Sequence, residues 1–206
     1  MSQLADEPRL RVVVFCASAE GDDPSLMALA REVGVEIAER GAGLVYGGGR
    51  VGLMGAVADG ALSVGGEVIG VIPQQLVDRE VAHLGLSELV VTESMHERKA
   101  AMAELADGFI ALPGGFGTLE EVVEILTWNQ LGIIQMPVVF CDVSMGDSSF
   151  WAPFIGFCDH AVAAGVLRGR HRKMMQWTDR AATAVDIALS AAPDVAPKWK
   201  DFPPRP

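Results

Sequence analysis

The residues with the clearest chemical potential form a glycine-rich turn that ends in two acids. Residues 113–121 read PGGFGTLEE, and they lie between a buried apolar run and an amphipathic stretch. A strand that enters a helix through such a turn brings unpaired amide N–H groups and the positive end of the helix dipole together. Because glycines let an anion approach closely, the turn predicts a phosphate site. The G-K-[ST] ending of an ATP-type loop is absent.

Two residues of this turn, Thr118 and Glu121, allow two interpretations. Their spacing matches a capping box, in which both side chains satisfy local backbone donors and Glu121 complements the helix dipole. Alternatively, Glu121 is a catalytic carboxylate beside a bound phosphate. A second glycine turn at a neighbouring strand end favours catalysis, because open α/β sheets bind their ligands at this edge.

That second turn, residues 47–52 (GGGRVG), also lies between an expected strand and an expected helix. It has the G-x-G-x-x-G spacing of a dinucleotide-binding loop. The acid twenty positions on, Glu67, opens its strand instead of ending it, which argues against NAD. Gly48 and Gly49 either contact a ligand through their backbone or only let the helix pack closely on the strand. The sequence leaves both interpretations open.

Between the two turns, residues 95–99 (MHERK) open another expected helix. Met95, Arg98 and Met102 share one helical face, so Arg98 would be carried towards the pocket on a largely apolar surface. Its planar guanidinium would hold a phosphate, a ribose hydroxyl or a carboxylate in a fixed orientation. The alternative is that residues 97–99 are an ordinary solvated charge run.

In this order and spacing, the three segments resemble the LOG (Lonely Guy) family, over about residues 11–188. Its members are cytokinin riboside 5′-monophosphate phosphoribohydrolases, often mislabelled lysine decarboxylases. The resemblance implies a Rossmann-like fold, a homodimer, and hydrolysis of a nucleoside monophosphate, a cytokinin riboside monophosphate or AMP, to the free base and ribose 5-phosphate. It places Arg98 and Glu121 at the catalytic positions.

The resemblance also implies a set of nucleotide contacts around this pair. They are Glu80, Lys99, Gly115, Phe116, Gly117, Thr118, Leu119, Glu120 and Thr127. The glycine turn and the apolar helix face add Gly114 and Met95 as substrate-binding residues, and Ser18, after the first strand, lies within reach of a ligand.

The expected mechanism follows from the bond that breaks. Cleaving an N-glycoside builds positive charge on the ribose and negative charge on the departing base, so the site needs a carboxylate near C1′, an activated water and a donor to the base. We expect Glu121 to stabilise the sugar cation or orient the water, and Arg98 to position the ribose phosphate and polarise the leaving group. The competing hypothesis is a nucleotide-binding or sensing module without turnover. Such a binder gains nothing from a carboxylate beside an anionic ligand.

No cofactor and no metal are expected. Amino-acid decarboxylation normally uses pyridoxal phosphate on a Schiff-base lysine, but Lys99 lies in the nucleotide motif and two of the other three lysines lie in a proline-rich tail. The four histidines form no metal-ligand spacing. Two segments depart from the family pattern, residues 17–19 (ASA) and residues 142–151, where the family commonly has an asparagine- and tyrosine-containing loop. We therefore expect base recognition to differ from the family norm.

The elements that must position these residues follow from apolar runs that alternate with amphipathic stretches. This alternation is typical of an α/β fold, a mostly parallel sheet with helices on both faces. Residues 1–192 are expected to form one Rossmann-like three-layer domain, followed by an extended Pro-rich tail at 193–206. The expected strands are 10–16, 43–46, 67–72, 88–92, 109–112, 137–141 and 173–177, and the expected helices are 24–40, 53–64, 95–106, 118–131, 150–164 and 180–191.

Composition limits the function further. The chain has 206 residues, is 50% hydrophobic and carries a net charge of −11, which disfavours binding to nucleic acid or to an anionic membrane. The three cysteines are an odd number at no metal-ligand spacing, as expected for reduced thiols in a cytoplasmic protein. No apolar window approaches ~18 residues. The apolar faces of the helices at 118–131 and 150–164 are candidates for a homodimer interface.

Overall fold

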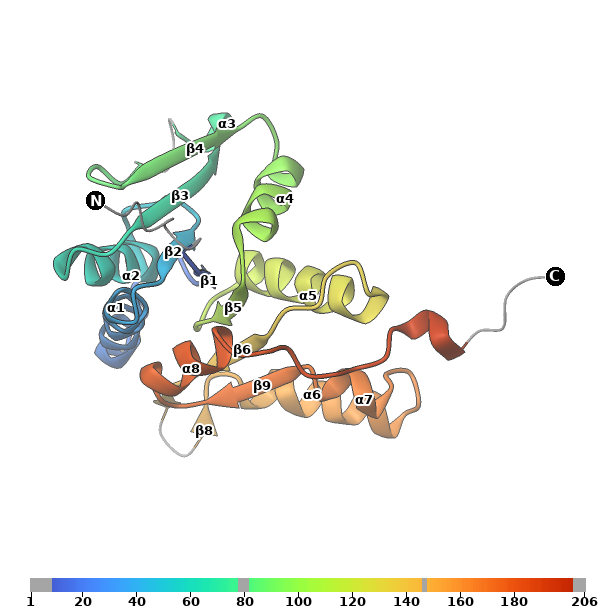
Figure 1. The fold of residues 1–206 in the computed structure, drawn as a ribbon. Coiled ribbons are helices and arrows are strands. Elements are labelled where there is room, and N and C mark those ends of the chain that lie inside the picture. The colour runs from blue at the N-terminus through green and yellow to red at the C-terminus, as the bar shows by residue number, and fades with distance from the viewer. Residues whose placement is uncertain (1–8, 78–81, 146–147, 202–206) are drawn as a thin grey trace, which may run out of the picture.

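The sheet at the centre of the molecule determines where the site can form. The computed structural model describes residues 9–77, 82–145 and 148–201. Seven parallel strands pair in the order β4-β3-β2-β1-β5-β6-β9 (Figure 1). The strands are β1 (Arg11–Phe15), β2 (Gly43–Tyr46), β3 (Val68–Pro73), β4 (Glu88–Thr92), β5 (Gly108–Ala111), β6 (Val138–Cys141) and β9 (Met175–Thr178).

Helices cover both faces of this sheet and make the three layers. The core on one face includes α1 (Pro24–Glu39), α2 (Gly52–Ser63) and α8 (Ala181–Ala188), and the core on the other includes α4 (Met95–Leu105), α5 (Phe116–Leu131) and α6 (Ala152–Ala163). The shorter elements are α3 (Gln74–Val77), α7 (Gly169–Arg172), the hairpin β7 (Ser144–Met145) with β8 (Ser148–Ser149), and η1 (Lys198–Asp201).

The central strand β1 shows why its sequence is apolar throughout. Val12 and Val14 pack into the core under α1 and α2, whereas Val13 and Phe15 pack into the core under α4 and α5. A strand buried on both faces needs an unbroken apolar run instead of an alternating one. Since strand order reverses direction between β1 and β5, their carboxyl ends form the crevice in which open α/β folds bind ligands.

The predicted Rossmann-like three-layer fold is confirmed, and the differences lie at element ends. The expected edge strand at 173–177 is β9, paired in parallel with β6. The helix expected from residue 118 begins at Phe116, because Gly115 is its N-cap. Sequence analysis missed α3, α7, η1 and the β7–β8 hairpin, which are too short for a periodic pattern.

The C-terminal segment returns across the molecule beside α5. Trp199 Nε1 donates to the Leu131 carbonyl at 3.1 Å, and Arg170 Nε donates to the Ala196 carbonyl at 3.2 Å. In the part of the chain that the structure describes, no helix has the length and apolar character needed to cross a bilayer.

Candidate active site

A cleft opens at the carboxyl ends of β1 and β5, where the fold predicts ligand binding. Its empty volume is about 830 Å³. The loop after β1, the glycine turn before α5 and the first turns of α2 and α4 supply its walls. The lining residues are Cys16, Ala17, Ser18, Ala19, Met54, Met95, Arg98, Gly115, Phe116, Gly117, Thr118, Glu120 and Glu121.

Arg98 and Glu121 form an ion pair in this cleft. Arg98 Nη2 lies 3.2 Å from Glu121 Oε1, and each side chain is only 10% exposed. Burial raises the pKa of the Glu121 carboxyl above its usual range, and the charge of Arg98 partly offsets this effect. The site therefore holds a shielded carboxylate beside a fixed cation, the combination that a sugar cation and a departing base require.

Helix α4 is fixed at the turn that carries Arg98. Ser94, its N-cap, accepts a hydrogen bond from the Glu97 amide at 3.2 Å, and the Glu97 side chain accepts one from the Glu93 amide at 3.0 Å. These two bonds, a variant of the capping box in which the acid accepts from the residue before the N-cap, order the first turn of the helix. Arg98 thus projects from a helical turn whose backbone is fixed by these hydrogen bonds.

The Arg98 guanidinium fits against the first glycine turn. A Cβ atom on Gly47 would lie 2.5 Å from Arg98 Nη2, so a side chain at this position would displace the guanidinium. Arg98 Nε is buried and, among the described residues, has no hydrogen-bond partner. A buried donor of this kind remains to be satisfied by a water or a ligand.

The capping-box interpretation of Thr118 and Glu121 is wrong. Gly115 is the N-cap of α5 and offers no side chain, so Thr118 is already the third helical residue. Glu121 instead points to Arg98. No side-chain cap bonds the first amides of α5, which leaves the N-terminal N–H groups and the helix dipole available for an anion.

The first glycine turn, in contrast, is occupied by the protein itself. In the first turn of α2, the Leu53 amide donates to the Ala19 carbonyl and the Met54 amide to the Ala17 carbonyl, both at 3.3 Å. Gly48 accepts from the His83 amide, and Gly49 forms a β-bridge with Ala82. Neither glycine lines the cleft, so the structure places both in close packing.

The acid that argued against dinucleotide binding also has another partner. Glu67 lies just before β3 and pairs with Arg11, with 3.2 Å between Oε2 and Nε. It therefore sits at the opposite end of the sheet from the cleft. The objection to NAD made from the sequence agrees with this placement.

Residues 97–99 are not simply a solvated charge run. Arg98 is 9% exposed, and the Lys99 side chain is 13% exposed. Lys99 Nζ lies 2.5 Å from Glu120 Oε1 and 3.0 Å from Glu124 Oε2. Sequence analysis missed Glu124, although it follows Glu120 by four residues, the spacing that places two side chains on one helix face.

The predicted substrate contacts divide between the cleft and its surroundings. Those that line the cleft are Ser18, Met95, Gly115, Phe116, Gly117, Thr118 and Glu120, whereas Gly114, Leu119 and Lys99 do not line it. Thr127 lies in a separate groove beside α5, and its hydroxyl donates to the Val123 carbonyl at 2.8 Å. Glu80 lies outside the described residues.

Sequence analysis also missed Asp142, which organises the segment that departs from the family pattern. This residue is 1% exposed. Oδ1 accepts from the Val143 and Phe150 amides, and Oδ2 accepts from the Trp151 amide and from Trp177 Nε1, at 2.7–3.1 Å. An acid directly after a buried strand was the available signal, because a buried carboxylate needs several donors.

No metal site accompanies the cleft in the described parts of the chain, where no three or more His, Cys, Asp and Glu side chains gather as ligands. Cys16 lines the cleft, and burial raises the pKa of its thiol, which keeps it protonated.

Comparisons with known proteins bear on the family of this chain. A family model described as "Possible lysine decarboxylase" matches residues 54–188. The chain is 47% identical over 165 residues to the cytokinin riboside 5′-monophosphate phosphoribohydrolase LOG of Oryza sativa subsp. japonica, a match that covers 80% of this chain and 66% of the rice protein. It is 46% identical over 157 residues to the cytokinin riboside 5′-monophosphate phosphoribohydrolase of Rhodococcoides fascians, covering 76% of this chain and 77% of that protein.

Solved structures support the fold alone. The molybdenum cofactor binding protein of Rippkaea orientalis superposes with a TM-score of 0.64 at 20% identity, covering 87% of this chain and 96% of that one. The Moco carrier protein of Chlamydomonas reinhardtii gives 0.64 at 22% identity, with 87% and 95% coverage. The sequence relatives are far closer than these, and together with the family model they show that this chain belongs to the LOG family.

Proposed function

We propose that this chain hydrolyses the N-glycosidic bond of cytokinin riboside 5′-monophosphates, and of AMP, to the free base and ribose 5-phosphate. The observation that carries the proposal is the shielded Arg98–Glu121 pair beside the uncapped N-terminus of α5. The names of the relatives from Oryza sativa and Rhodococcoides fascians support it. A nucleotide-binding module without turnover would have no use for a buried carboxylate close to its anionic ligand.

The 5′-phosphate would bind at the turn formed by Gly114, Gly115, Phe116, Gly117 and Thr118. The free amides of α5 and its dipole favour a dianion at this place. Binding energy from the phosphate would place C1′ near Glu121, so that affinity for a non-reacting group is used to orient the reacting one.

At the reacting centre, the C1′–N bond breaks and a C1′–O bond forms with water. Glu121 would stabilise the positive charge that develops on the ribose and accept a proton from the attacking water. Arg98 would hold the nucleotide in register and stabilise the negative charge on the departing base, which then takes up a proton. Met95 and Met54 would provide an apolar surface against which the base packs.

The test is to incubate the protein with isopentenyladenosine monophosphate and, separately, with AMP, and to measure free base and ribose 5-phosphate by chromatography. We expect both products in equal amounts from each nucleotide. Isopentenyladenosine, which lacks the phosphate, is the matched control and should be turned over very slowly. Nucleotide binding without either product would favour the binding module.

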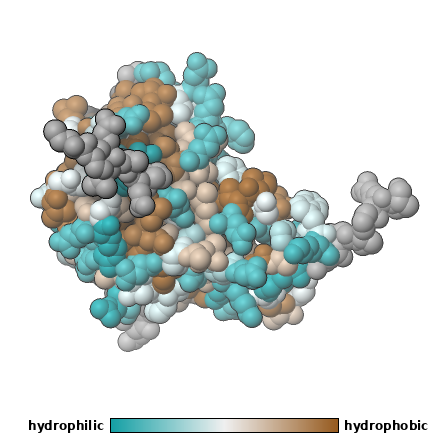
Figure 2. Space-filling model, in the orientation of Figure 1, coloured by the Kyte–Doolittle hydropathy of each residue, from teal (hydrophilic) through white to brown (hydrophobic). Residues whose placement is uncertain are grey.

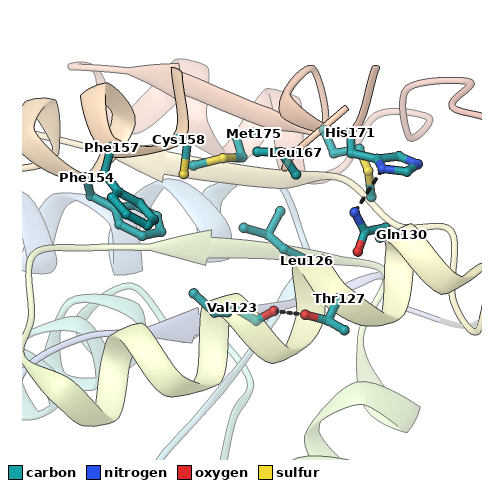
Figure 3. Close-up of a pocket in the computed structure, with 11 residues that line it drawn as sticks. Val123, Leu126, Thr127, Gln130, Phe154, Phe157, Cys158, Leu167, His171 and Met175 are labelled. Atoms are coloured by element: carbon teal, nitrogen blue, oxygen red, sulfur yellow. Dashed lines mark hydrogen bonds between the residues drawn. The ribbon is translucent and has the colours of Figure 1, made fainter. Parts of the chain in front are cut away.

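We further propose that the protein is a homodimer, built on an apolar groove between α5, α6 and α7 (Figure 3). Its lining includes Val123, Leu126, Phe154, Phe157 and Leu167, and its empty volume is about 590 Å³. Phe157 is 65% exposed and Val123 is 42% exposed. In Figure 2 apolar side chains also gather over α5 and the loop after it. A second copy of the chain that covered this groove would bury the exposed side chains of Phe157 and Val123.

Two further proposals concern the chain as a whole. Residues 1–192 would form a single domain, followed by the Pro-rich segment 193–206, of which the described part lies beside α5. The cytoplasm would be its compartment, since Cys16, Cys141 and Cys158 are free thiols, all buried, and a reducing environment keeps them so.

A further inference from the structure

We propose that Glu124 is a positioning residue for this reaction, which acts through Lys99 to hold α4 against α5 so that Arg98 faces Glu121. The inference rests on the proposed function. Glu124 does not line the cleft, so its effect on the chemistry has to pass through another side chain.

The geometry consists of three ion pairs, made by two consecutive residues of α4. Arg98 and Lys99 are consecutive on α4, and they meet Glu121 on one side and Glu120 with Glu124 on the other. Lys99 Nζ lies 3.0 Å from Glu124 Oε2. The Glu124 side chain is 22% exposed and the Glu120 side chain is 53% exposed. The contact with Glu120 is the shorter one, but solvent screens it more, so Glu124 is the better shielded partner of Lys99.

The two helices need such an anchor because their backbones make little direct contact. Helix α4 packs mainly on β1, β3 and β4, and in the described parts of the chain the ion pairs that join it to α5 are those of Arg98 and Lys99. Apolar side chains of both helices share one core, and the ion pairs that bridge the helices set the final distance between the charged groups of Arg98 and Glu121. Small errors in such a distance have large effects on turnover.

The effect of Glu124 on the pKa of Glu121 distinguishes a positioning role of Glu124 from a direct electrostatic one. Burial and the charges of Glu120 and Glu124 raise the pKa of Glu121, and Arg98 and Lys99 lower it. Acting only as a charge, Glu124 would oppose ionisation of the carboxylate that the reaction uses. Removing it should therefore damage the geometry while making Glu121 easier to ionise. The charged or titratable groups that face Glu121 are Arg98 and Lys99 from α4, Glu120 and Glu124 from its own helix, and Cys16 after β1.

The experiment compares Glu124→Ala and Glu124→Gln with the wild-type protein. Glu124→Ala removes the anchor, so kcat should fall about tenfold with KM changed less than about twofold. Glu124→Gln keeps an oxygen that accepts from Lys99, so it should recover most of the lost kcat. In both variants the acid limb of the kcat–pH profile should move to lower pH, a shift that general loss of structure does not produce.

Glu36→Gln is the matched control. The Glu36 side chain is 23% exposed and pairs with Arg40, the C-cap of α1, a helix that covers the opposite face of the sheet. This variant should leave both kcat and the acid limb unchanged. Equal kcat in Glu124→Ala and Glu36→Gln, or an unmoved acid limb in both Glu124 variants, would overturn the inference.

A second readout separates this inference from the proposed function. The ionisation of Glu121 can be followed by carbon NMR of labelled glutamate side chains without any substrate, with Glu121→Gln to assign the resonance. If the wild-type protein released no products, the proposed function would fail. A lower Glu121 pKa in Glu124→Gln would then still support the coupling, and an unchanged pKa would reject it.

Discussion

At the scale of single residues, Glu121 is buried, although the proposed reaction needs its side chain as a charged carboxylate. Glu121 is 8% exposed as a residue, and its partner Arg98 is held against Gly47, where a side chain would collide with it. A buried pair of this kind is weak evidence for stability, because desolvation offsets much of the attraction between the charges. The presence of this pair is better explained by the proposed reaction, in which it stabilises the charges that develop on the ribose and the departing base.

Replacement of Glu121 by glutamine tests this directly. The variant keeps the size of the side chain and loses its charge, so we expect kcat to fall by roughly 10²–10⁴-fold with KM for the nucleotide nearly unchanged. Steady-state release of ribose 5-phosphate measures both constants. Turnover near the wild-type value would remove Glu121 from the chemistry.

The raised pKa of Glu121 predicts a pH dependence of activity. The carboxyl must be ionised to act, so kcat should decline as the pH falls, with a midpoint above the ordinary value of 4.5. The kcat–pH profile measures it.

The same shift predicts an effect on stability. The folded protein binds this proton more tightly than the unfolded chain, so the carboxyl costs no stability at pH below its unfolded pKa and costs most above its folded pKa. As the pH rises from the unfolded pKa to the folded pKa, the wild type loses this stability and Glu121→Gln does not. The free energy of unfolding of the variant, minus that of the wild type, should therefore increase with pH across that interval. Denaturant titrations at several pH values measure it, and a constant difference would contradict this account.

At the scale of elements, turns and loop anchors position the site. The glycine turn before α5 leaves its amides free, whereas the turn before α2 gives its amides to the loop after β1. Two glycine-rich turns thus differ in function: one leaves amides available for a ligand, and the other uses its amides to hold a neighbouring loop. After β6, Asp142 gathers four donors and fixes the path of the chain towards Trp151.

Gly47→Ala should reduce activity more than stability. The added methyl group would lie 2.5 Å from Arg98 Nη2 and force the guanidinium to move, so we expect kcat to fall at least about tenfold. Gly156→Ala, which places a methyl group in open space on α6, is the control and should keep full activity. Equal kcat in the two variants would exclude Gly47 as the residue that makes room for Arg98.

Asp142→Ala should destabilise the fold. Four N–H groups would lose their acceptor in a buried place, and we expect a loss of about 2–4 kcal/mol in the free energy of unfolding. Asp159→Ala is the control, since Asp159 is 59% exposed and pairs with Arg172 at the surface, a type of pair worth about 0–1 kcal/mol. Denaturant titration compares them. Similar losses would mean that the Asp142 hydrogen bonds contribute little.

At the scale of the whole molecule, the surface beside α5 and the cleft share one helix. Phe116 lies at the start of α5, lines the cleft and is 93% exposed, and Val123, two turns on, lines the apolar groove. A partner that covered the groove would therefore approach the rim of the cleft. The proposed homodimer thus links assembly to the nucleotide site.

Phe157→Glu should break the proposed dimer. A charge placed in the apolar groove would have to be desolvated on association, so the variant should sediment as a monomer where the wild type sediments as a dimer. Val64→Glu, at an exposed position after α2, should leave association unchanged. Analytical ultracentrifugation decides, and identical masses for the wild type and Phe157→Glu would reject this surface as the interface.

The sequence alone determined the layers, the strand-and-helix alternation and the family, because periodicity and local motifs are written along the chain. Through the family resemblance it also pointed to Arg98 and Glu121 as candidates. Only the tertiary structure decided that Glu121 meets Arg98 instead of capping its own helix, that Lys99 turns to Glu124, and that Thr127 lies in a different groove from the cleft. Each of these outcomes depends on how separate helices pack. Competing partners for one side chain differ by only a few kcal/mol, so the choice is made by the assembled structure.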